Sequence, residues 1–154
     1  MEKITIKKGQ FLQRKGERST RVYIVLSGLL RSYSIDNKGK EHIFMFAPEH
    51  WTIADSNPPD MPSELYIDAI ENSTLIAVEK NEESPNIEKI LRRINVLQKR
   101  IILLMSASAI ERYEHFIETY PDIVQRVPQR MIASYLGITP EALSKVKGQR
   151  RKKT

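Results

Sequence analysis

The chain has 154 residues and a net charge of +6, enough length for one compact domain or for two small ones joined by a helix. Hydrophobic residues make up 40% and charged residues 29%, which is ordinary for a globular protein and argues against wholesale disorder. No run approaches the roughly 18 apolar residues that a membrane span needs. The absence of cysteine excludes disulfides and thiolate metal sites. With no signal peptide recognised at the N-terminus, we expect a cytoplasmic protein.

Residues 3–80 alternate short apolar runs with turns. The runs are rich in β-branched and aromatic residues, and they predict strands over residues 22–26, 29–35, 43–46, 65–70 and 74–78. Asp36-Asn37-Lys38-Gly39 predicts a hairpin turn. Three prolines in residues 57–62 predict a loop, because proline cannot donate to a sheet ladder. Many short strands with regular turns favour a sandwich or a barrel.

Residues 83–106 carry a seven-residue repeat that predicts a dimerisation helix, with Ser84-Pro85 as its start. β-branched residues at the a positions and mostly leucine at d favour a parallel two-stranded coiled coil. The alternative is a helix that packs on its own domain, and the extra apolar residues of the stripe are enough for the helix to do both. The residues of the seam recur at spacings of three and four: Ile87, Ile90, Ile94, Leu97, Ile101 and Leu104.

The following residues predict helices that end in a helix-turn-helix. One helix over about residues 107–119 stops before Pro121, and another opens at Pro128. Gly137 then stands where the chain reverses in a left-handed conformation. Thr139-Pro140-Glu141 opens the last helix with a hydroxyl cap, a first-turn proline and an acid at the positive end of the helix dipole. The two helices are expected to pack through Ile132, Ala133, Leu136, Leu143 and Val146.

The net positive charge of the chain comes from residues 125–154, where eight basic residues stand against one acid, a net charge of +7. This asymmetry is expected if one end of the chain meets a polyanion, although a basic run at a C-terminus is often only a solvated tail. Glu141 can accept from cytosine and Lys145 can donate to guanine or to a phosphate. Residues 149–154 are expected to follow the last helix and to act as an arm if they act at all. The candidate DNA-binding residues are Gln129, Arg130, Thr139, Pro140, Glu141, Ser144, Lys145, Lys147, Arg150 and Arg151.

Residues 126–145 closely resemble the helix-turn-helix of Crp/Fnr-type transcription regulators, with the Bacteroidetes-like variety as the nearest match. Residues 8–16 and 23–31 are similar to the first strands of that family's cyclic-nucleotide-binding-like β-roll. The resemblance implies an α+β chain with a jelly-roll-like antiparallel β-roll over 1–82, a long dimerisation helix over 83–106, and a helix-turn-helix domain with a basic tail over 107–154. It implies a homodimeric, sequence-specific regulator that binds double-stranded DNA and has an effector-sensing or degenerate β-roll, and it suggests RNA polymerase as a further partner.

The resemblance does not extend to the ligand-binding signature. In family members that bind cyclic nucleotides, a Gly-Glu turn and an arginine hold the ribose and the cyclic phosphate, and the corresponding residues 51–67 contain neither. A buried phosphate without a cationic partner is costly, so cyclic AMP and cyclic GMP are not expected to bind. The effector stays unidentified, with Phe46 and Trp51 as candidate contacts for a more apolar ligand.

No catalytic, metal or cofactor site is expected. A cupin-type metal site needs a close histidine cluster, and His42 and His50 lie too far apart for that motif. Nucleophile, phosphate-loop and dinucleotide motifs are also missing. The sequence therefore favours a regulator over an enzyme. The alternatives are a small-molecule sensor with weak DNA contact and a cupin-like metalloenzyme.

Overall fold

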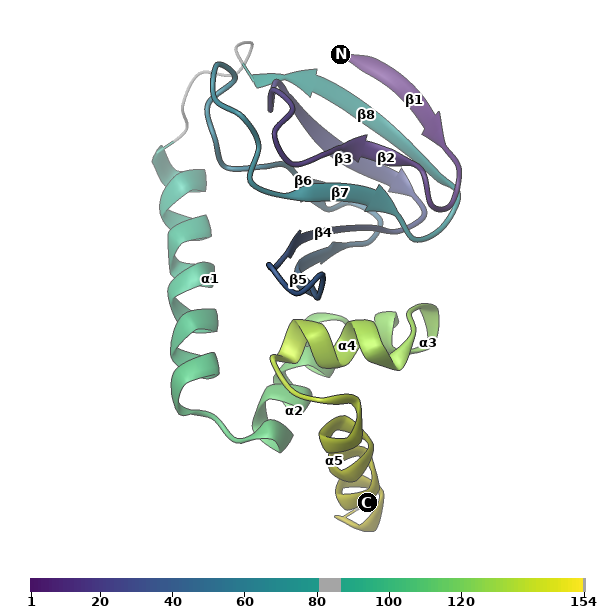
Figure 1. Cartoon of the computed structure of the whole chain (residues 1–154), viewed down its shortest axis with the longest axis vertical. Helices are drawn as coiled ribbons and strands as arrows, with labels where there is room; N and C mark the ends of the chain where they lie inside the picture. Colours follow the sequence, from purple (N-terminus) through teal and green to yellow (C-terminus); the bar gives the residue numbers. More distant parts are fainter. Residues whose placement is uncertain (81–86, 154) are drawn as a thin grey trace. The chain divides into compact units, whose positions relative to one another are not determined.

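The computed structural model describes residues 1–80 and 87–153, and the chain divides into two compact units, Met1–Ser84 and Pro85–Thr154. Within the described residues the first unit contains the strands and the second contains the helices (Figure 1). The long helix with the seven-residue repeat thus belongs to the same unit as the C-terminal helices. The expected helix start at Ser84-Pro85 lies outside the described residues.

The strands form two four-stranded antiparallel sheets. One sheet has the order β1 (Glu2–Ile6), β8 (Ser73–Glu79), β3 (Arg21–Ser27) and β6 (Thr52–Ile53). The other has the order β2 (Phe11–Gln13), β7 (Tyr66–Ala69), β4 (Leu30–Ile35) and β5 (Glu41–Ala47). Neighbouring strands of a sheet are mostly distant in the sequence, as in a jelly roll. The antiparallel, jelly-roll-like class that the sequence predicted is confirmed.

The five predicted strands correspond to β3, β4, β5, β7 and β8, with ends that differ by at most two residues. The apolar runs did not predict the short strands β1, β2 and β6, because runs of two or three apolar positions are too short to stand out. β2 does lie within residues 8–16, which resemble the first strands of the family. Residues 57–62 form a loop, as expected, apart from one isolated bridge between Arg18 and Pro62.

Alternating side chains of the strands fill the space between the two sheets. Val25, Leu30, Ile67 and Leu75 are fully buried there, and Met45 is nearly so. Each such side chain contributes about 1.5–3 kcal/mol to stability through removal of its apolar surface from water. Since these residues come from both sheets, their burial holds the two layers together.

The turn of the β4–β5 hairpin lies at residues 36–39, as the sequence predicted, and the side chain of Asp36 closes it. Its carboxylate accepts hydrogen bonds from the backbone N–H of Lys38 at 2.8 Å and of Lys40 at 3.0 Å, and Gly39 adopts φ +78°. The side chain of His42 lies 2.8 Å from the same carboxylate. These contacts, with His42 first, lower the pKa of Asp36 to about 2, so the turn keeps its charged acceptor at neutral pH.

The second unit contains α1 (Ile87–Ser106), α2 (Ala109–Thr119), α3 (Ile123–Arg126), α4 (Gln129–Leu136) and α5 (Pro140–Lys153). Ser108 and Glu111 form a capping box that starts α2. The sequence did not predict the short α3, which lies between α2 and α4. None of the described helices is long and apolar enough to cross a membrane.

The expectation of a separate arm after the last helix is wrong for residues 149–153, because α5 continues through them. Gln, Arg and Lys are good helix formers, and positive charges at a helix C-terminus interact favourably with its dipole. The basic residues therefore extend the helix instead of leaving it.

The helices of the second unit pack around an aromatic centre. Phe116 is fully buried, and its ring centroid lies 5.3 Å from those of both Tyr120 and Tyr135. Ile123 of α3 and Ile132 of α4 are also buried, to 1% and 0% exposure. The short helix α3 thus supplies part of the core through Ile123.

Two buried serines of the β-roll give a matched test of its hydrogen bonding. Ser32 is 1% exposed, and in the described structure its Oγ has no hydrogen-bond partner. Ser73 is 3% exposed, but its Oγ accepts from the N–H of Leu29 and donates to the carbonyl of Glu71. We expect Ser32→Ala to leave the free energy of unfolding unchanged or to raise it by up to about 1 kcal/mol, since no bond is lost.

In contrast, Ser73→Ala should lower the free energy of unfolding by about 1–3 kcal/mol, because it leaves buried backbone groups without a partner. Urea unfolding followed by the fluorescence of Trp51, the one tryptophan and a residue of the β-roll, measures both variants. Equal losses in the two variants would contradict the assignment of Ser32 as unpaired.

Candidate functional site

The turn between α4 and α5 has the geometry that its sequence predicts. Gly137 adopts φ +68° and ψ +32°, the left-handed conformation, and the N–H of Ile138 donates to the carbonyl of Ala133 at 3.0 Å. Two residues later, the Oγ1 of Thr139 accepts from the N–H of Ala142 at 3.1 Å and caps α5. The glycine turn and the threonine cap together fix the direction in which α5 leaves α4.

The packing of α5 on its neighbours determines which of its residues face solvent. Leu143 and Val146 are 0% and 5% exposed, and Ala133 and Leu136 of α4 are similarly buried. Ala133, one of the residues through which the two helices are predicted to pack, has a small side chain, which allows a close approach of the helices. With one face of α5 buried, its polar residues are left on the opposite side.

A hollow of about 430 Å³ lies along that polar side and is called the α5 hollow below. Its lining brings together five of the candidate DNA-binding residues, and Gly148 leaves its backbone uncovered there. Lys147 and Arg151 make this surface positively charged. The residues of the lining are Gln129, Pro140, Ser144, Lys147, Gly148 and Arg151.

The other candidate DNA-binding residues lie beside the α5 hollow and not in its lining. Glu141 and Lys145 are exposed one position further round α5, and Thr139 is exposed at its cap. Hydrogen bonds at the start of the helix lower the pKa of Glu141, which therefore stays ionised at neutral pH. Arg130 on α4 and Arg150 on α5 are exposed as well.

Two arginines that the sequence analysis did not single out tie α4 to the other helices of its unit. The guanidinium of Arg112 on α2 donates to the carbonyls of Leu104 at 2.7 Å and of Leu136 at 3.3 Å, near the C-terminal ends of α1 and α4. Arg100 on α1 lies 4.0 Å from the ring centroid of Tyr135 on α4. These contacts link the long helix to the element that carries the glycine turn.

The predicted dimerisation seam is exposed in the single chain. Ile87, Ile94 and Ile101 are 71%, 45% and 56% exposed, and none of the described residues of α1 is buried. A helix of one chain rarely leaves so much apolar surface in contact with water. The exposure is the pattern that a helix covered by a second copy would show.

In the β-roll, the side chain of Asp55 organises the loop between β6 and β7. Its Oδ1 accepts from the N–H of Asn57 at 2.9 Å, and its Oδ2 accepts from the N–H groups of Glu64 and Leu65 at 2.8 and 2.9 Å. Lys80, just after β8, donates through Nζ to the backbone carbonyls of Asp55 and Asn57. Residues 51–67, where the resemblance puts the phosphate contacts, therefore already contain an internal carboxylate.

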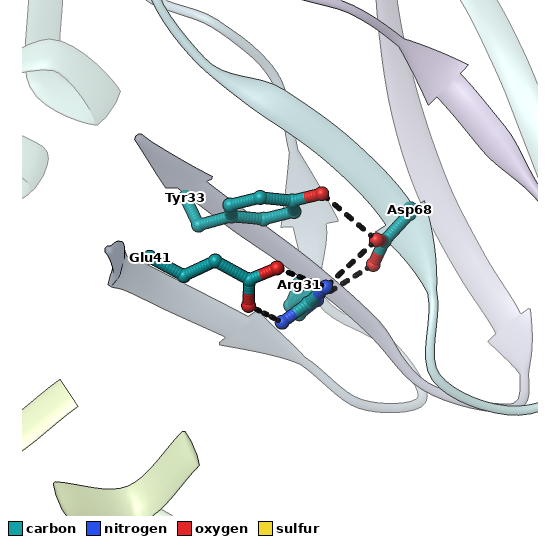
Figure 2. A network of polar contacts seen from close by, with 4 residues as sticks. All are labelled: Arg31, Tyr33, Glu41 and Asp68. Carbon is teal, nitrogen blue, oxygen red and sulfur yellow. Dashed lines mark hydrogen bonds and ion pairs between the residues drawn. The ribbon is translucent and has the colours of Figure 1, made fainter. Parts of the chain in front are cut away.

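The β-roll also contains a buried arginine, which Figure 2 shows with its partners. Arg31 on β4 donates to both carboxylate oxygens of Asp68 on β7, at 2.8 and 3.0 Å, and to Glu41 on β5 at 2.6 Å. Burial alone would lower the pKa of Arg31, but these bonds outweigh it and raise the pKa. Burial and the nearby Asp68 raise the pKa of Tyr33 to about 12. The guanidinium is thus already paired with carboxylates and is not a vacant partner for a phosphate.

The candidate effector contacts Phe46 and Trp51 do not line the cleft that the structure describes on the β-roll. Phe46 is fully buried, and Trp51 is partly buried against the core between the sheets. A surface cleft of about 620 Å³ is lined by residues of β1, β2 and the segments that follow them, including Phe11 and Arg14, but by neither Phe46 nor Trp51. An effector role for Phe46 and Trp51 stays a prediction.

Metal ligands do not gather in the described part of the chain. No group of three or more histidine, aspartate or glutamate side chains there could hold a metal ion. His42 contacts Asp36, and His50 and His115 are exposed.

Comparison with solved structures shows which known proteins share the fold of this chain. Several solved structures share its fold over almost the whole chain. FixK2 from Bradyrhizobium japonicum has a TM-score of 0.76 at 21% identity, covering 99% of this chain and 85% of its own. A transcriptional regulator of the CRP/FNR family from Thermus thermophilus has a TM-score of 0.70 at 16% identity, with 99% and 87% covered. A mutant of CooA from Carboxydothermus hydrogenoformans has a TM-score of 0.67 at 15% identity, with 98% and 76% covered.

The sequence comparison adds the family. Residues 3–83 match the family model described as "Cyclic nucleotide-binding domain", so the chain belongs to the cyclic nucleotide-binding domain family. Its structural neighbours are Crp/Fnr-family transcription regulators, and at such low sequence identity the structural similarity shows a common fold. No curated protein matches the sequence significantly.

The glycine turn gives a second test with a matched control. A Cβ on Gly137 would meet side-chain atoms no closer than 3.8 Å, so Gly137→Ala adds backbone strain and no clash. Because φ is +68°, we expect the free energy of unfolding to fall by about 1–2 kcal/mol. Gly148 lies inside α5, and a Cβ added there would meet open space. Gly148→Ala should therefore raise the free energy of unfolding by up to about 1 kcal/mol.

Urea unfolding followed by circular dichroism at 222 nm measures both glycine variants. The opposite signs are the decisive result, since the same methyl group is added in each case. A stabilising Gly137→Ala would contradict the left-handed turn.

Proposed function

We propose that this protein is a homodimeric, sequence-specific DNA-binding transcription regulator of the Crp/Fnr type. The proposal is based on the polar face of α5, where Lys147 and Arg151 line the α5 hollow. The left-handed turn at Gly137 joins α5 to α4 in a defined direction. Such a pair is the geometry of a helix-turn-helix, in which the second helix enters the major groove. The match to the cyclic nucleotide-binding domain and the Crp/Fnr fold neighbours support the same function. The Bacteroidetes-like variety stays a prediction.

In this proposal the residues of α5 divide into two roles. Glu141 and Lys145 are exposed near its N-terminal half, where a recognition helix contacts base edges. Arg150 and Arg151, on the last turns, contact phosphates and add affinity without sequence choice. Ser144 and Gln129 line the α5 hollow between these two sets and are further candidates for base or phosphate contacts.

The dimer in this proposal forms through α1. Two copies that pair along their exposed isoleucine and leucine seam would bury apolar surface that the single chain leaves in water. Two-fold symmetry would then present two α5 helices to half-sites about one helical turn, ~34 Å, apart on the DNA. RNA polymerase is a further candidate partner, which the resemblance alone suggests.

The β-roll in this proposal does not bind cyclic AMP or cyclic GMP. The described part of residues 51–67 supplies no cationic side chain to a phosphate, and Arg31 is paired with Asp68 and Glu41. A phosphate there would also compete with the Asp55 carboxylate for the same backbone N–H groups.

The DNA contacts can be separated by variants of α5. Binding sites are first selected from random double-stranded DNA, and affinities for a selected and a random duplex are then measured at several salt concentrations. Lys145→Ala should reduce the preference for the selected duplex by about 1–3 kcal/mol, the value of one good base contact. Replacement of Arg150 and Arg151 by alanine should weaken binding to both duplexes. It should also reduce the salt slope, the slope of the logarithm of the affinity against the logarithm of the salt concentration, by up to about 2.

Lys99→Ala on α1 is the control for general charge effects, because this exposed lysine lies outside the proposed interface. It should change neither the preference nor the salt slope. If the double arginine variant abolished the preference while Lys145→Ala preserved it, the assignment of the two roles would be wrong. If the wild-type protein selected no sequence, the proposed function would fail.

The proposed dimer predicts different outcomes for two lysine substitutions on α1. Ile94→Lys places like charges at the dimer axis and should dissociate the dimer, with a parallel loss of DNA affinity. Val96, which is 56% exposed, lies outside the seam, so Val96→Lys should leave the dimer intact. Sedimentation equilibrium measures the mass of each variant. A dimeric Ile94→Lys variant would show that this seam is not the interface.

A further inference from the structure

Three backbone N–H groups of the β6–β7 loop converge on one buried carboxylate. Asp55 is 3% exposed, and its two oxygens accept from Asn57, Glu64 and Leu65 at 2.8–2.9 Å. The donors come from both ends of the loop, since one lies two residues after Asp55 and the others nine and ten residues after it. The carboxylate therefore joins the two ends of a loop that has no strand of its own between β6 and β7.

The arrangement has the chemistry of an anion-binding site. Two successive N–H groups, those of Glu64 and Leu65, point at the same oxygen, which is how a backbone nest holds a negatively charged group. Hydrogen bonds from N–H donors to a charged acceptor are about twice as strong as those between neutral groups. Without the carboxylate, the three part-buried donors would converge on a space that contains no acceptor.

The surroundings of Asp55 hold the loop without neutralising the carboxylate directly. Lys80 donates to the Oγ of Ser19 and to the backbone carbonyls of Asp55 and Asn57, and the described structure shows no direct bond from its Nζ to the carboxylate oxygens. Burial lowers the pKa of Lys80, and the charge of Asp55 opposes this effect. Ser63, which is 2% exposed, donates to the carbonyl of Arg14 and fixes the far end of the loop.

We propose that Asp55 is a built-in ligand: the β6–β7 loop is an oxyanion site of the carboxylate and phosphate class, and the chain's own carboxylate occupies it. The β-roll therefore reaches its ordered loop conformation with no effector bound. Removal of the side chain opens a site for a small external carboxylate. A consequence is that DNA binding needs no anionic effector, and this consequence rests on the proposed function. The existence of the site does not depend on the proposed function.

The test is chemical rescue of Asp55→Ala by formate. The variant should unfold at a lower temperature than the wild-type protein, as reported by the fluorescence of Trp51 in the β-roll. Relative to sodium chloride at equal ionic strength, sodium formate should reverse half or more of this decrease in Tm, and the effect should saturate as the formate concentration rises. Sodium acetate and phosphate, as further arms, test the size of the site.

Ile67→Ala is the matched control, because Ile67 is fully buried in the same β-roll and its truncation opens an apolar space that does not bind anions. Formate should shift its Tm only as much as it shifts that of the wild-type protein. Equal shifts of Asp55→Ala and Ile67→Ala, or an unchanged Tm in Asp55→Ala, would overturn the proposal.

Asp55→Asn is a second control, and the refolding comparison below keeps the experiment decisive if the alanine variant is not folded at the start. The amide still fills the site but has lost the charge and one acceptor, so this variant should be destabilised and should not respond to formate. If formate raised the Tm of Asp55→Asn as much as that of Asp55→Ala, the claim that removal of the side chain opens the site would be wrong. The refolding yield of Asp55→Ala from urea, with formate against chloride, gives the same comparison. Since no DNA is present, failure of the proposed function would leave these results unaffected.

Discussion

The left-handed turn at Gly137 is the constraint on which the proposed interface depends. It reverses the chain between α4 and α5, and the Thr139 cap begins the new helix two residues later. With the direction of α5 fixed, Leu143 and Val146 become buried and the polar residues of the same helix must face outward. The position of the α5 hollow, and with it the grouping of Lys147 and Arg151, follows from one residue that tolerates a positive φ.

Arginines extend this constraint to the rest of the helical unit. Arg112 donates to the backbone carbonyls of Ala107, Leu104 and Leu136, and the last two of these lie near the ends of α1 and α4. The C-terminal carbonyls of a helix have no partner within the helix, so a guanidinium that reaches two helices satisfies both ends at once. The long helix with its exposed seam and the helix before the glycine turn are thereby held by shared bonds.

The sequence predicted what depends on local patterns and missed what depends on distant partners. β3, β4, β5, β7 and β8 were predicted because their apolar runs are local, and the turn at Gly137 because a glycine directly after an apolar helix face is typical of a left-handed helix end. The carboxylate of Asp55 and the guanidinium of Arg31 were missed as organising groups, since their partners lie up to ten and 37 residues away. A polar residue inside a strand, such as Arg31 on β4, is the signal that a buried pair exists, but it does not name the partner. The separate arm was wrong because charge alone does not distinguish a solvated tail from a charged helix.

The glycine inside α5 has a thermodynamic consequence for the end of the chain. Gly148 weakens a helix by about 1 kcal/mol relative to alanine, and the like charges of Lys147 and Arg151, four residues apart on the same helix, repel each other. Both effects act against the last turns of α5 and in favour of an unwound end. A nearby polyanion removes the repulsion, so helix formation in these turns and association with a polyanion are linked equilibria. Low ionic strength, which strengthens the repulsion, should therefore lower the helical content of the last turns, whereas a bound polyanion should raise it.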